Sequence, residues 1–189
     1  MKLLLPLALS IASSLALSSC ASQGLTSIEP APPAYRPYGV EVQVYPAGII
    51  PGLHARYRLS DADTLTFRLA ANLTDRQDFG EREDESGDGW GSGVGWRRAL
   101  SGDLDETGWY FGARVDVWDL SIDWRDRGRS GTTDIIVLQP TAEGGYGWTT
   151  ERAGRFELGL GLGAEINVDT QGEDVGEGAI LLLGLTWLP

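Results

Sequence analysis

Cysteine and histidine are almost absent from this chain: its 189 residues include one of each, Cys20 and His54. A single cysteine cannot form a disulfide within the chain, and it cannot supply a thiolate metal site. A single histidine means that any histidine-dependent catalysis has to use His54. The scarcity of cysteine therefore excludes disulfide-stabilised scaffolds and thiolate metal centres.

Lysine is also missing beyond Lys2, and the chain carries 27 acidic against 15 basic residues, which gives a formal net charge of −12. Removal of residues 1–19 would take away Lys2 and no acid, so the charge would go from −12 to −13. A nucleic-acid partner needs a basic stripe for its phosphates. We therefore expect no nucleic acid among the partners.

The first twenty residues predict a leader. One charged residue precedes an apolar run over residues 3–17, which is typical of a secretory signal that is too short to span a membrane. The ending Leu17-Ser18-Ser19-Cys20 is similar to the lipobox of bacterial lipoprotein signals. That resemblance implies cleavage before Cys20, acylation of its thiol and new amino group, and, because Ala21 follows, delivery to the outer membrane. The alternative is an ordinary signal peptide with a coincidental cysteine.

A stretch rich in serine, proline and alanine follows the leader. Its prolines prevent a helix or a central strand; they are Pro30, Pro32, Pro33 and Pro37. We interpret it as a tether. The predicted organisation is a lipoprotein signal peptide over residues 1–19, a lipidated Cys20 with the tether over residues 20–37, and a β-barrel domain over residues 38–189.

From residue 38 onward, apolar and polar side chains alternate, which is the pattern of two-faced β-strands. The clearest segment covers residues 156–168, and it has about the length that crosses a bilayer core at a tilt, roughly 9–11 residues. Seven further segments repeat the pattern, at residues 38–45, 53–59, 65–73, 90–99, 109–124, 136–148 and 179–188. The sequence therefore predicts eight strands and no helix.

One of these segments changes phase. Its apolar face runs through Val115 and Val117 and then continues through Trp118 and Leu120. A β-bulge near Trp118 or Asp119 would produce such a slip, so we expect one there.

The gaps between segments alternate in length. Residues 60–63, 101–107 and 149–154 form short gaps, whereas residues 125–132 and 169–178 form longer ones and the acidic residues 75–89 form the longest. Short periplasmic turns and longer external loops are typical of outer-membrane barrels. Residues 84–89 also resemble the start of a calcium loop, but the twelfth position holds Gly95 where such a loop needs glutamate. We expect a solvated acidic loop, with weak cation binding as the alternative.

The polar face of the segments is rich in glycine, and it carries five arginines and five carboxylates. A narrow eight-stranded barrel needs small residues inside, and buried charges need partners. We therefore assign these residues to a polar barrel interior: Glu41, His54, Arg56, Arg58, Arg68, Arg97, Arg114, Asp116, Glu143, Glu157 and Glu165. The rival arrangement is a soluble barrel with its apolar face inside.

Taken together, residues 38–188 resemble the small eight-stranded outer-membrane barrels of the OmpA and OmpX type. The resemblance implies an all-β fold, an eight-stranded antiparallel up-and-down transmembrane β-barrel with a polar interior. It departs at the end, because Trp187 is followed by Leu188 and Pro189 where such barrels usually finish on an aromatic residue. Aromatic residues near strand ends suit the two membrane interfaces: Tyr38, Tyr45, Trp90, Trp109, Trp124, Trp148, Phe156 and Trp187.

Candidates for chemistry are few. Lipid A deacylases and acyltransferases are small barrels that combine a histidine with a serine and a carboxylate, but no serine lies beside His54 at a suitable spacing. We expect no enzymatic activity, no cofactor and no metal. The predicted role is structural in the envelope or a surface interaction, with a lipid-modifying enzyme or a soluble, lipid-anchored barrel for an apolar ligand as alternatives.

The predicted partners are outer-membrane lipids. An external protein could also bind through the loops or through a hairpin over residues 118–139, whose strand edge would be free. We expect the chain to be a monomer.

Overall fold

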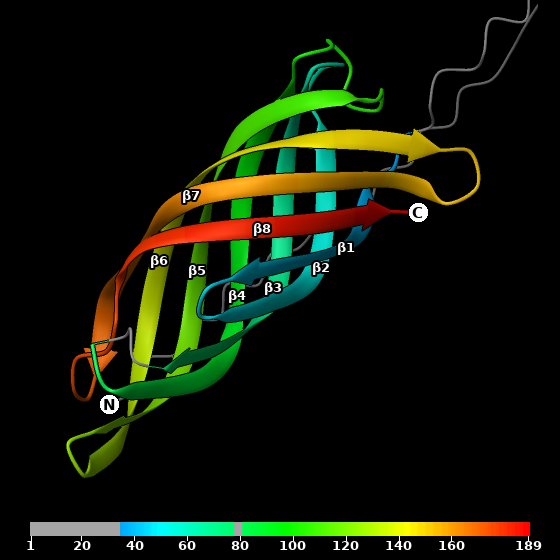
Figure 1. Cartoon of the computed structure of the whole chain (residues 1–189). Helices are drawn as coiled ribbons and strands as arrows, with labels where there is room; N and C mark the ends of the chain where they lie inside the picture. The colour runs from blue at the N-terminus through cyan, green and yellow to red at the C-terminus, as the bar shows by residue number, and fades with distance from the viewer. Residues whose placement is uncertain (1–34, 78–80) are drawn as a thin grey trace, which may run out of the picture. The chain divides into compact units, whose positions relative to one another are not determined.

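The computed structural model describes residues 35–77 and 81–189, and within them every regular element is a β-strand. No helix in this described part is long and apolar enough to cross a membrane. The predicted signal peptide, Cys20 and nearly all of the predicted tether lie outside the described residues. The strands are β1 (Tyr38–Tyr45), β2 (Gly48–Arg58), β3 (Asp63–Gln77), β4 (Asp84–Ala99), β5 (Gly108–Asp126), β6 (Arg129–Thr150), β7 (Gly154–Gln171) and β8 (Gly178–Leu188) (Figure 1).

The eight strands form one closed antiparallel barrel in which each strand pairs with its neighbours in the chain. β8 closes the ring against β1, with Val40 opposite Trp187 and Val44 opposite Leu183. The predicted eight-stranded up-and-down barrel is confirmed. We call the rim where β1 begins and β8 ends the chain-end rim, and the opposite rim the far rim.

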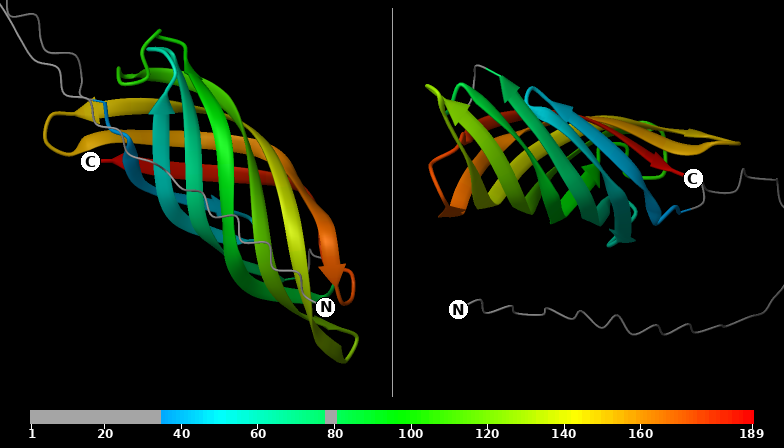
Figure 2. Two further views of the ribbon diagram at one scale, coloured as in Figure 1. Left: turned by 180° about the vertical axis from the view of Figure 1, so that it is seen from behind. Right: turned by 90° about the horizontal axis from the view of Figure 1, so that it is seen from below.

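The strands are longer than predicted on one side of the barrel. At the far rim β1 ends at Tyr45 and β8 begins at Gly178, whereas β5 and β6 stay paired as far as Asp126 and Arg129. The β5–β6 hairpin therefore extends well past the β1–β2 turn (Figures 1 and 2). A tight turn joins these two strands, with positive φ at both Arg127 and Gly128, which is the backbone that two-residue hairpins favour.

The prediction of long loops at the far rim is wrong. Residues 84–89 are part of β4, paired on one side with β3 and on the other with β5. Only residues 78–83 separate β3 from β4. Glycines and acidic residues in this stretch suggested a loop, because they have a weak propensity to form strands. Pairing with a strand on each side overrides that preference.

The predicted β-bulge near Trp118 is also wrong. Asp116, Trp118, Leu120 and Ile122 all point inward in unbroken alternation, and β5 keeps its register with both neighbours. A register shift occurs instead between β6 and β7, at Ile136 and Val137. The apolar residues of β5 change phase in the sequence because the barrel interior changes from charged to apolar at this level. The strand itself does not slip.

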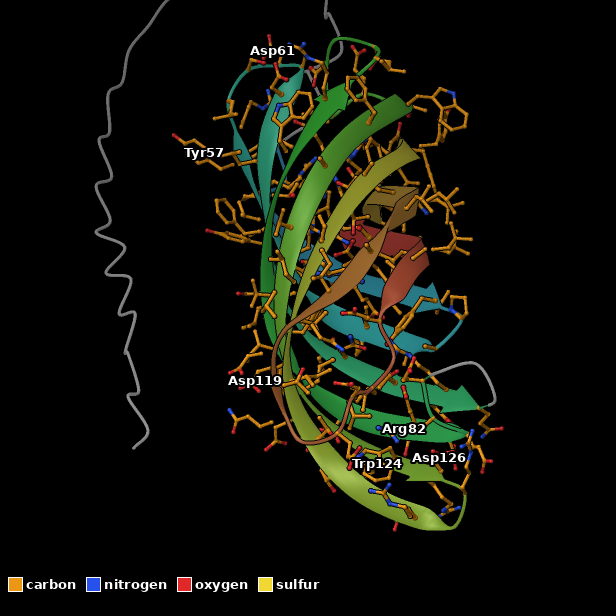
Figure 3. The ribbon with its side chains drawn as sticks, turned by 90° about the vertical axis from the view of Figure 1, so that its left-hand side faces the viewer. Tyr57, Asp61, Arg82, Asp119, Trp124 and Asp126 are labelled. Carbon is orange, nitrogen blue, oxygen red and sulfur yellow. The ribbon has the colours of Figure 1, made fainter. Side chains whose placement is uncertain are left out.

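The outward face carries a broad apolar belt. On β5 the belt ends with Val115 and Val117. A polar outward surface begins at Asp119 and continues toward the far rim. Figure 3 shows Asp119 pointing away from the ribbon. Exposed members of the belt include Val40, Val42, Val44, Leu53, Phe67, Leu69, Leu73, Val94, Phe111, Val115, Val117, Leu158, Leu160, Leu162, Leu181, Leu183 and Leu185.

Candidate functional site

The half of the interior nearer the chain-end rim is filled by ion pairs, which we call the lumen network. Arg97 on β4 lies at its centre: its Nε donates to Glu143 Oε1 at 2.6 Å and its Nη1 to Glu157 Oε2 at 2.8 Å. Its guanidinium carbon also lies 4.9 Å from the ring centre of Tyr110. A planar guanidinium can serve several carboxylates at once, which explains why arginine occupies this position.

Asp116 forms a second centre of the network. Arg68 Nη2 lies 2.8 Å and Arg114 Nε 2.9 Å from its Oδ2. Arg114 also reaches Glu41 and Glu143 at 3.5 Å. The two centres therefore join into one connected set across β1, β3, β4, β5, β6 and β7.

The structure brings most of the predicted interior residues together in this network. Arg58 is at its margin, since its side chain is 32% exposed at the chain-end rim. Glu165 is not part of it and pairs with Arg76 near the far rim. The residues that lie in the network are Glu41, His54, Arg56, Arg68, Arg97, Arg114, Asp116, Glu143 and Glu157.

His54 is buried beside Glu41, and its Nδ1 lies 3.8 Å from Glu41 Oε2. Neither ring nitrogen hydrogen-bonds another described residue. Because no described serine hydroxyl bonds either nitrogen, this geometry does not assemble a serine triad.

Three members of the network were missed from the sequence. Gln43 accepts a hydrogen bond from Arg114 Nη2 at 3.1 Å, and Arg155 donates to Glu157 at 2.8 Å. Both share the phase of a predicted interior residue on their own strand, so the alternation could have found them. Asp105, which pairs with Arg56 at 2.9 Å, lies in a turn, and periodicity gives no signal there.

Glycines on the inner face make room for large neighbours. A side chain at Gly91 would overlap the indole of Trp118, and one at Gly145 would overlap the ring of Tyr110. Both aromatic residues are buried. The glycines of the polar face therefore leave space for a few bulky interior side chains.

The half of the interior nearer the far rim is a packed apolar cluster, which we call the apolar plug. Trp118 is fully buried there, and its Nε1 donates to Gln139 Oε1 at 2.7 Å. Tyr45 and Trp124, predicted at an interface, point inward and belong to it. Its largest members are Tyr45, Ile50, Trp118, Leu120, Ile122, Trp124, Ile135, Val137, Val175, Ile180 and Leu182.

Residues 172–177 form a strap that covers the apolar plug. Val175 inserts into the plug with 4% of its surface exposed. Arg82 donates to Asp174 O at 2.9 Å and to Glu173 at 3.1 Å, and Arg129 donates to Glu173 at 3.0 Å. Arg82 also stacks on Trp124, with its guanidinium carbon 5.0 Å from the ring centre (Figure 3). The strap is therefore fastened to the connection between β3 and β4 and to β6.

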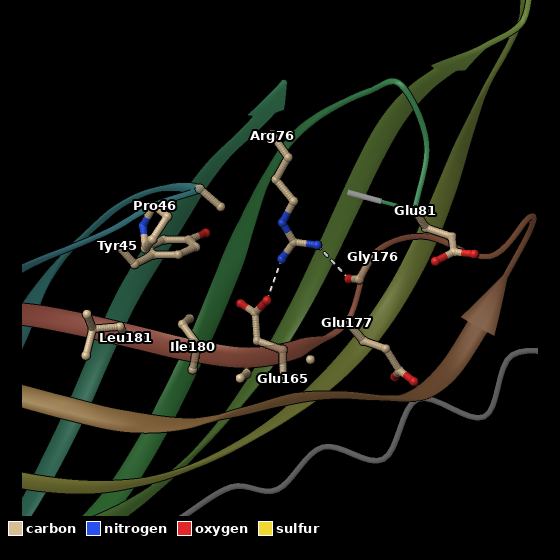
Figure 4. Close-up of a pocket in the computed structure, with 12 residues that line it drawn as sticks. Tyr45, Pro46, Arg76, Glu81, Glu165, Gly176, Glu177, Ile180 and Leu181 are labelled. Carbon is tan, nitrogen blue, oxygen red and sulfur yellow. Dashed lines mark hydrogen bonds and ion pairs between the residues drawn. The ribbon is translucent and has the colours of Figure 1, made fainter. Parts of the chain in front are cut away.

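A pocket of about 300 Å³ opens beside the strap, where β1, β2 and β8 stop and β3 and β7 continue; we call it the notch. Arg76 crosses it from β3, donating to Gly176 O at 2.6 Å and pairing with Glu165 of β7 (Figure 4). The notch is lined by Tyr45, Pro46, Ala47, Arg76, Glu81, Glu165, Gly176, Glu177, Gly178, Ala179, Ile180 and Leu181.

No group of His, Cys, Asp or Glu among residues 35–77 and 81–189 is placed to hold a metal ion. The calcium-loop alternative for residues 84–89 is wrong, because an extended paired strand cannot wrap its carboxylates around a cation.

No protein-family model matches the chain, and no curated protein matches it in sequence. Two solved structures are similar in fold. Neisserial surface protein A superposes with a TM-score of 0.51 at 13% identity, covering 80% of this chain and 93% of that one. The N-terminal β-barrel domain of Pseudomonas aeruginosa OprF gives a TM-score of 0.47 at 13% identity, with 79% and 93% covered. The first of these likenesses shows the eight-stranded barrel fold.

Proposed function

We propose that the chain is a lipid-anchored β-barrel of the bacterial outer membrane with a structural or surface-interaction role and no enzymatic activity. One observation carries this proposal: the apolar side chains of the belt face outward while the ion pairs face inward. In water this arrangement would expose a large apolar surface. In a bilayer it is the expected arrangement of a membrane barrel.

Aromatic contacts near the chain-end rim support this placement. Trp148 stacks on Phe156 with ring centres 5.7 Å apart, and Phe156 stacks on Trp187 at 6.5 Å. Trp109 and Tyr146 meet edge to face at 5.1 Å. Amphipathic rings of this kind are favoured at the boundary between lipid and water.

The orientation follows from the proposed anchor. A lipid on Cys20 and a tether over residues 20–37 would hold the chain-end rim at the periplasmic side. The far rim, with the strap and the long β5–β6 hairpin, would then face the outside.

The lumen network and the apolar plug leave little room for a channel. The space among Glu41, Arg97, Arg114 and Glu143 has a volume of about 10 Å³, which is barely enough for one water molecule. We therefore expect no measurable conductance.

The external surface is a sheet and not a set of loops. β4 and β7 pair along most of the 118–139 hairpin, and at its tip the edge facing β7 is unpaired over residues 129–133 of β6. A protein partner would accordingly bind this short edge or the polar outward face.

Alkaline carbonate extraction of Cys20→Ala tests the proposal. Without the lipid, a membrane-inserted barrel stays in the pellet, whereas a soluble barrel that is held only by its anchor is released. Release of the variant, with the wild-type chain retained, would contradict the proposal.

The absence of enzymatic activity has its own test. Lipid A from cells with the wild-type chain, with His54→Ala and with no protein should give the same mass spectrum. A mass change that depends on His54 would favour the lipid-modifying alternative.

A further inference from the structure

The notch has two kinds of lining. Tyr45, Pro46 and Ile180 form apolar walls, and Ala179 is exposed at the opening. Three carboxylates and one guanidinium supply the charge, which gives a formal net charge of −2. A pocket with apolar walls and an excess of carboxylates is complementary to a cation on an aliphatic stem.

Arg76 already demonstrates this mode of binding inside the notch. Its side chain is only 15% exposed, and its guanidinium pairs with Glu165 and lies 3.5 Å from Glu85. Arg76 thus neutralises the carboxylates at the base of the notch.

Two carboxylates remain at the opening. Among the described residues, neither Glu81 nor Glu177 makes an ion pair, although Glu177 accepts a hydrogen bond from the Asn167 amide at 2.9 Å. Figure 4 shows both on the side of the notch nearer the strap. They can receive a second cation without displacing Arg76.

We propose that the notch is a binding site for a linear alkylammonium ion, and that its occupant is a soluble polyamine. The aliphatic chain lies against Tyr45, Pro46 and Ile180, and the ammonium groups bind Glu81 and Glu177. The volume of about 300 Å³ suits one small extended molecule. Exposure of both carboxylates to water favours a soluble ligand over a lipid headgroup.

Titration of spermidine into the full chain in non-ionic detergent micelles at low salt tests the site. We expect saturable binding at one site per chain. The double variant Glu81→Gln with Glu177→Gln should bind spermidine about tenfold more weakly, because charge-assisted hydrogen bonds are lost. The double variant Asp123→Asn with Asp134→Asn removes the same charge from two carboxylates outside the notch that form no ion pair with another described residue, and it should change the affinity less than twofold.

A second variant separates shape from charge. Ala179→Trp keeps every carboxylate but fills the opening, so it should abolish saturable binding while circular dichroism shows a folded barrel. Equal weakening in both double variants, or normal binding by Ala179→Trp, would overturn the proposal. Because the titration needs no bilayer, its outcome is independent of whether the lipid anchor is confirmed.

Discussion

Arg97 and Arg98 are neighbours in the sequence with opposite surroundings. Arg97 binds two carboxylates inside the barrel, whereas Arg98 points outward, pairs with Asp63 and is 51% exposed. Removing one partner from a buried ion pair leaves the other charges uncompensated. The side of the strand, and not the residue type, therefore decides what each arginine contributes.

This contrast gives the first prediction. Arg97→Met should lower the free energy of unfolding by about 3–5 kcal/mol, and Arg98→Met by less than about 1 kcal/mol. Urea unfolding in lipid vesicles, followed by tryptophan fluorescence, measures both. Similar losses in the two variants would show that the lumen network is not what distinguishes them.

Gly91 gives a second prediction at this scale. A methyl group there would overlap the buried indole of Trp118, whereas at Gly144 the nearest atom is 3.6 Å away. We expect Gly91→Ala to destabilise the barrel by about 1–3 kcal/mol and Gly144→Ala to be nearly neutral. The same unfolding measurement compares them, and a neutral Gly91→Ala would mean that Trp118 can repack.

Individual residues were predictable where polarity and phase agreed. Arg68, Arg114 and Asp116 lie on the polar side of alternating segments, and the structure places them inside. The alternation could not rank their contacts, because pairing across the barrel joins strands that are far apart in the sequence. Arg76 and the notch escaped notice for that reason.

At the scale of elements, the strap is held by pairs that depend on pH. Hydrogen bonds from Arg129 and Arg82 hold the pKa of the Glu173 carboxyl below its usual range. A group whose pKa is lowered by folding stabilises the fold above its ordinary pKa, about 4.3 for glutamate, and this contribution is lost as the pH falls through the lowered value.

We therefore expect hydrogen-exchange protection of the strap, corrected for intrinsic rates, to fall as the pH drops from about 6 to below 4. Glu173→Gln, which cannot titrate, should be less protected at pH 6 and should lose less on acidification. An identical pH response in the variant would exclude Glu173 as the group responsible.

β5 shows what sequence reasoning misses about an element. Its alternation is continuous, but its inner face is charged at Arg114 and Asp116 and apolar at Trp118 and Leu120. The predicted bulge rests on the assumption that apolar side chains on β5 always face outward. The apolar residues from Trp118 onward instead face the interior. The outward change from Val117 to Asp119 was visible in the sequence and marks the same boundary.

At the scale of the whole molecule, the barrel combines two arrangements. Toward the chain-end rim it has an apolar exterior and a charged interior, and toward the far rim it has a polar exterior and an apolar interior. The second arrangement is that of a soluble barrel. We infer that the chain crosses the bilayer with the first part and extends into water with the second.

A charge placed on the belt tests this division. Val115→Arg should destabilise the barrel in vesicles by about 1–3 kcal/mol, because it puts a guanidinium into hydrocarbon between the midplane and the interface. Ser121→Arg, on the same face beyond Asp119, should change stability by less than about 0.5 kcal/mol. Equal tolerance of both changes would place Val115 in water.

The most direct measurement uses single cysteines in a Cys20→Ala chain, since no other cysteine is present. Each of the three variants, Val115→Cys, Val117→Cys and Asp123→Cys, is treated on intact cells with a membrane-impermeant maleimide, and again after the membrane is dissolved. We expect rapid labelling of Asp123→Cys on intact cells and no labelling of Val115→Cys or Val117→Cys until the membrane is dissolved. Labelling of Val115→Cys as fast as Asp123→Cys would contradict the insertion of the apolar belt into lipid.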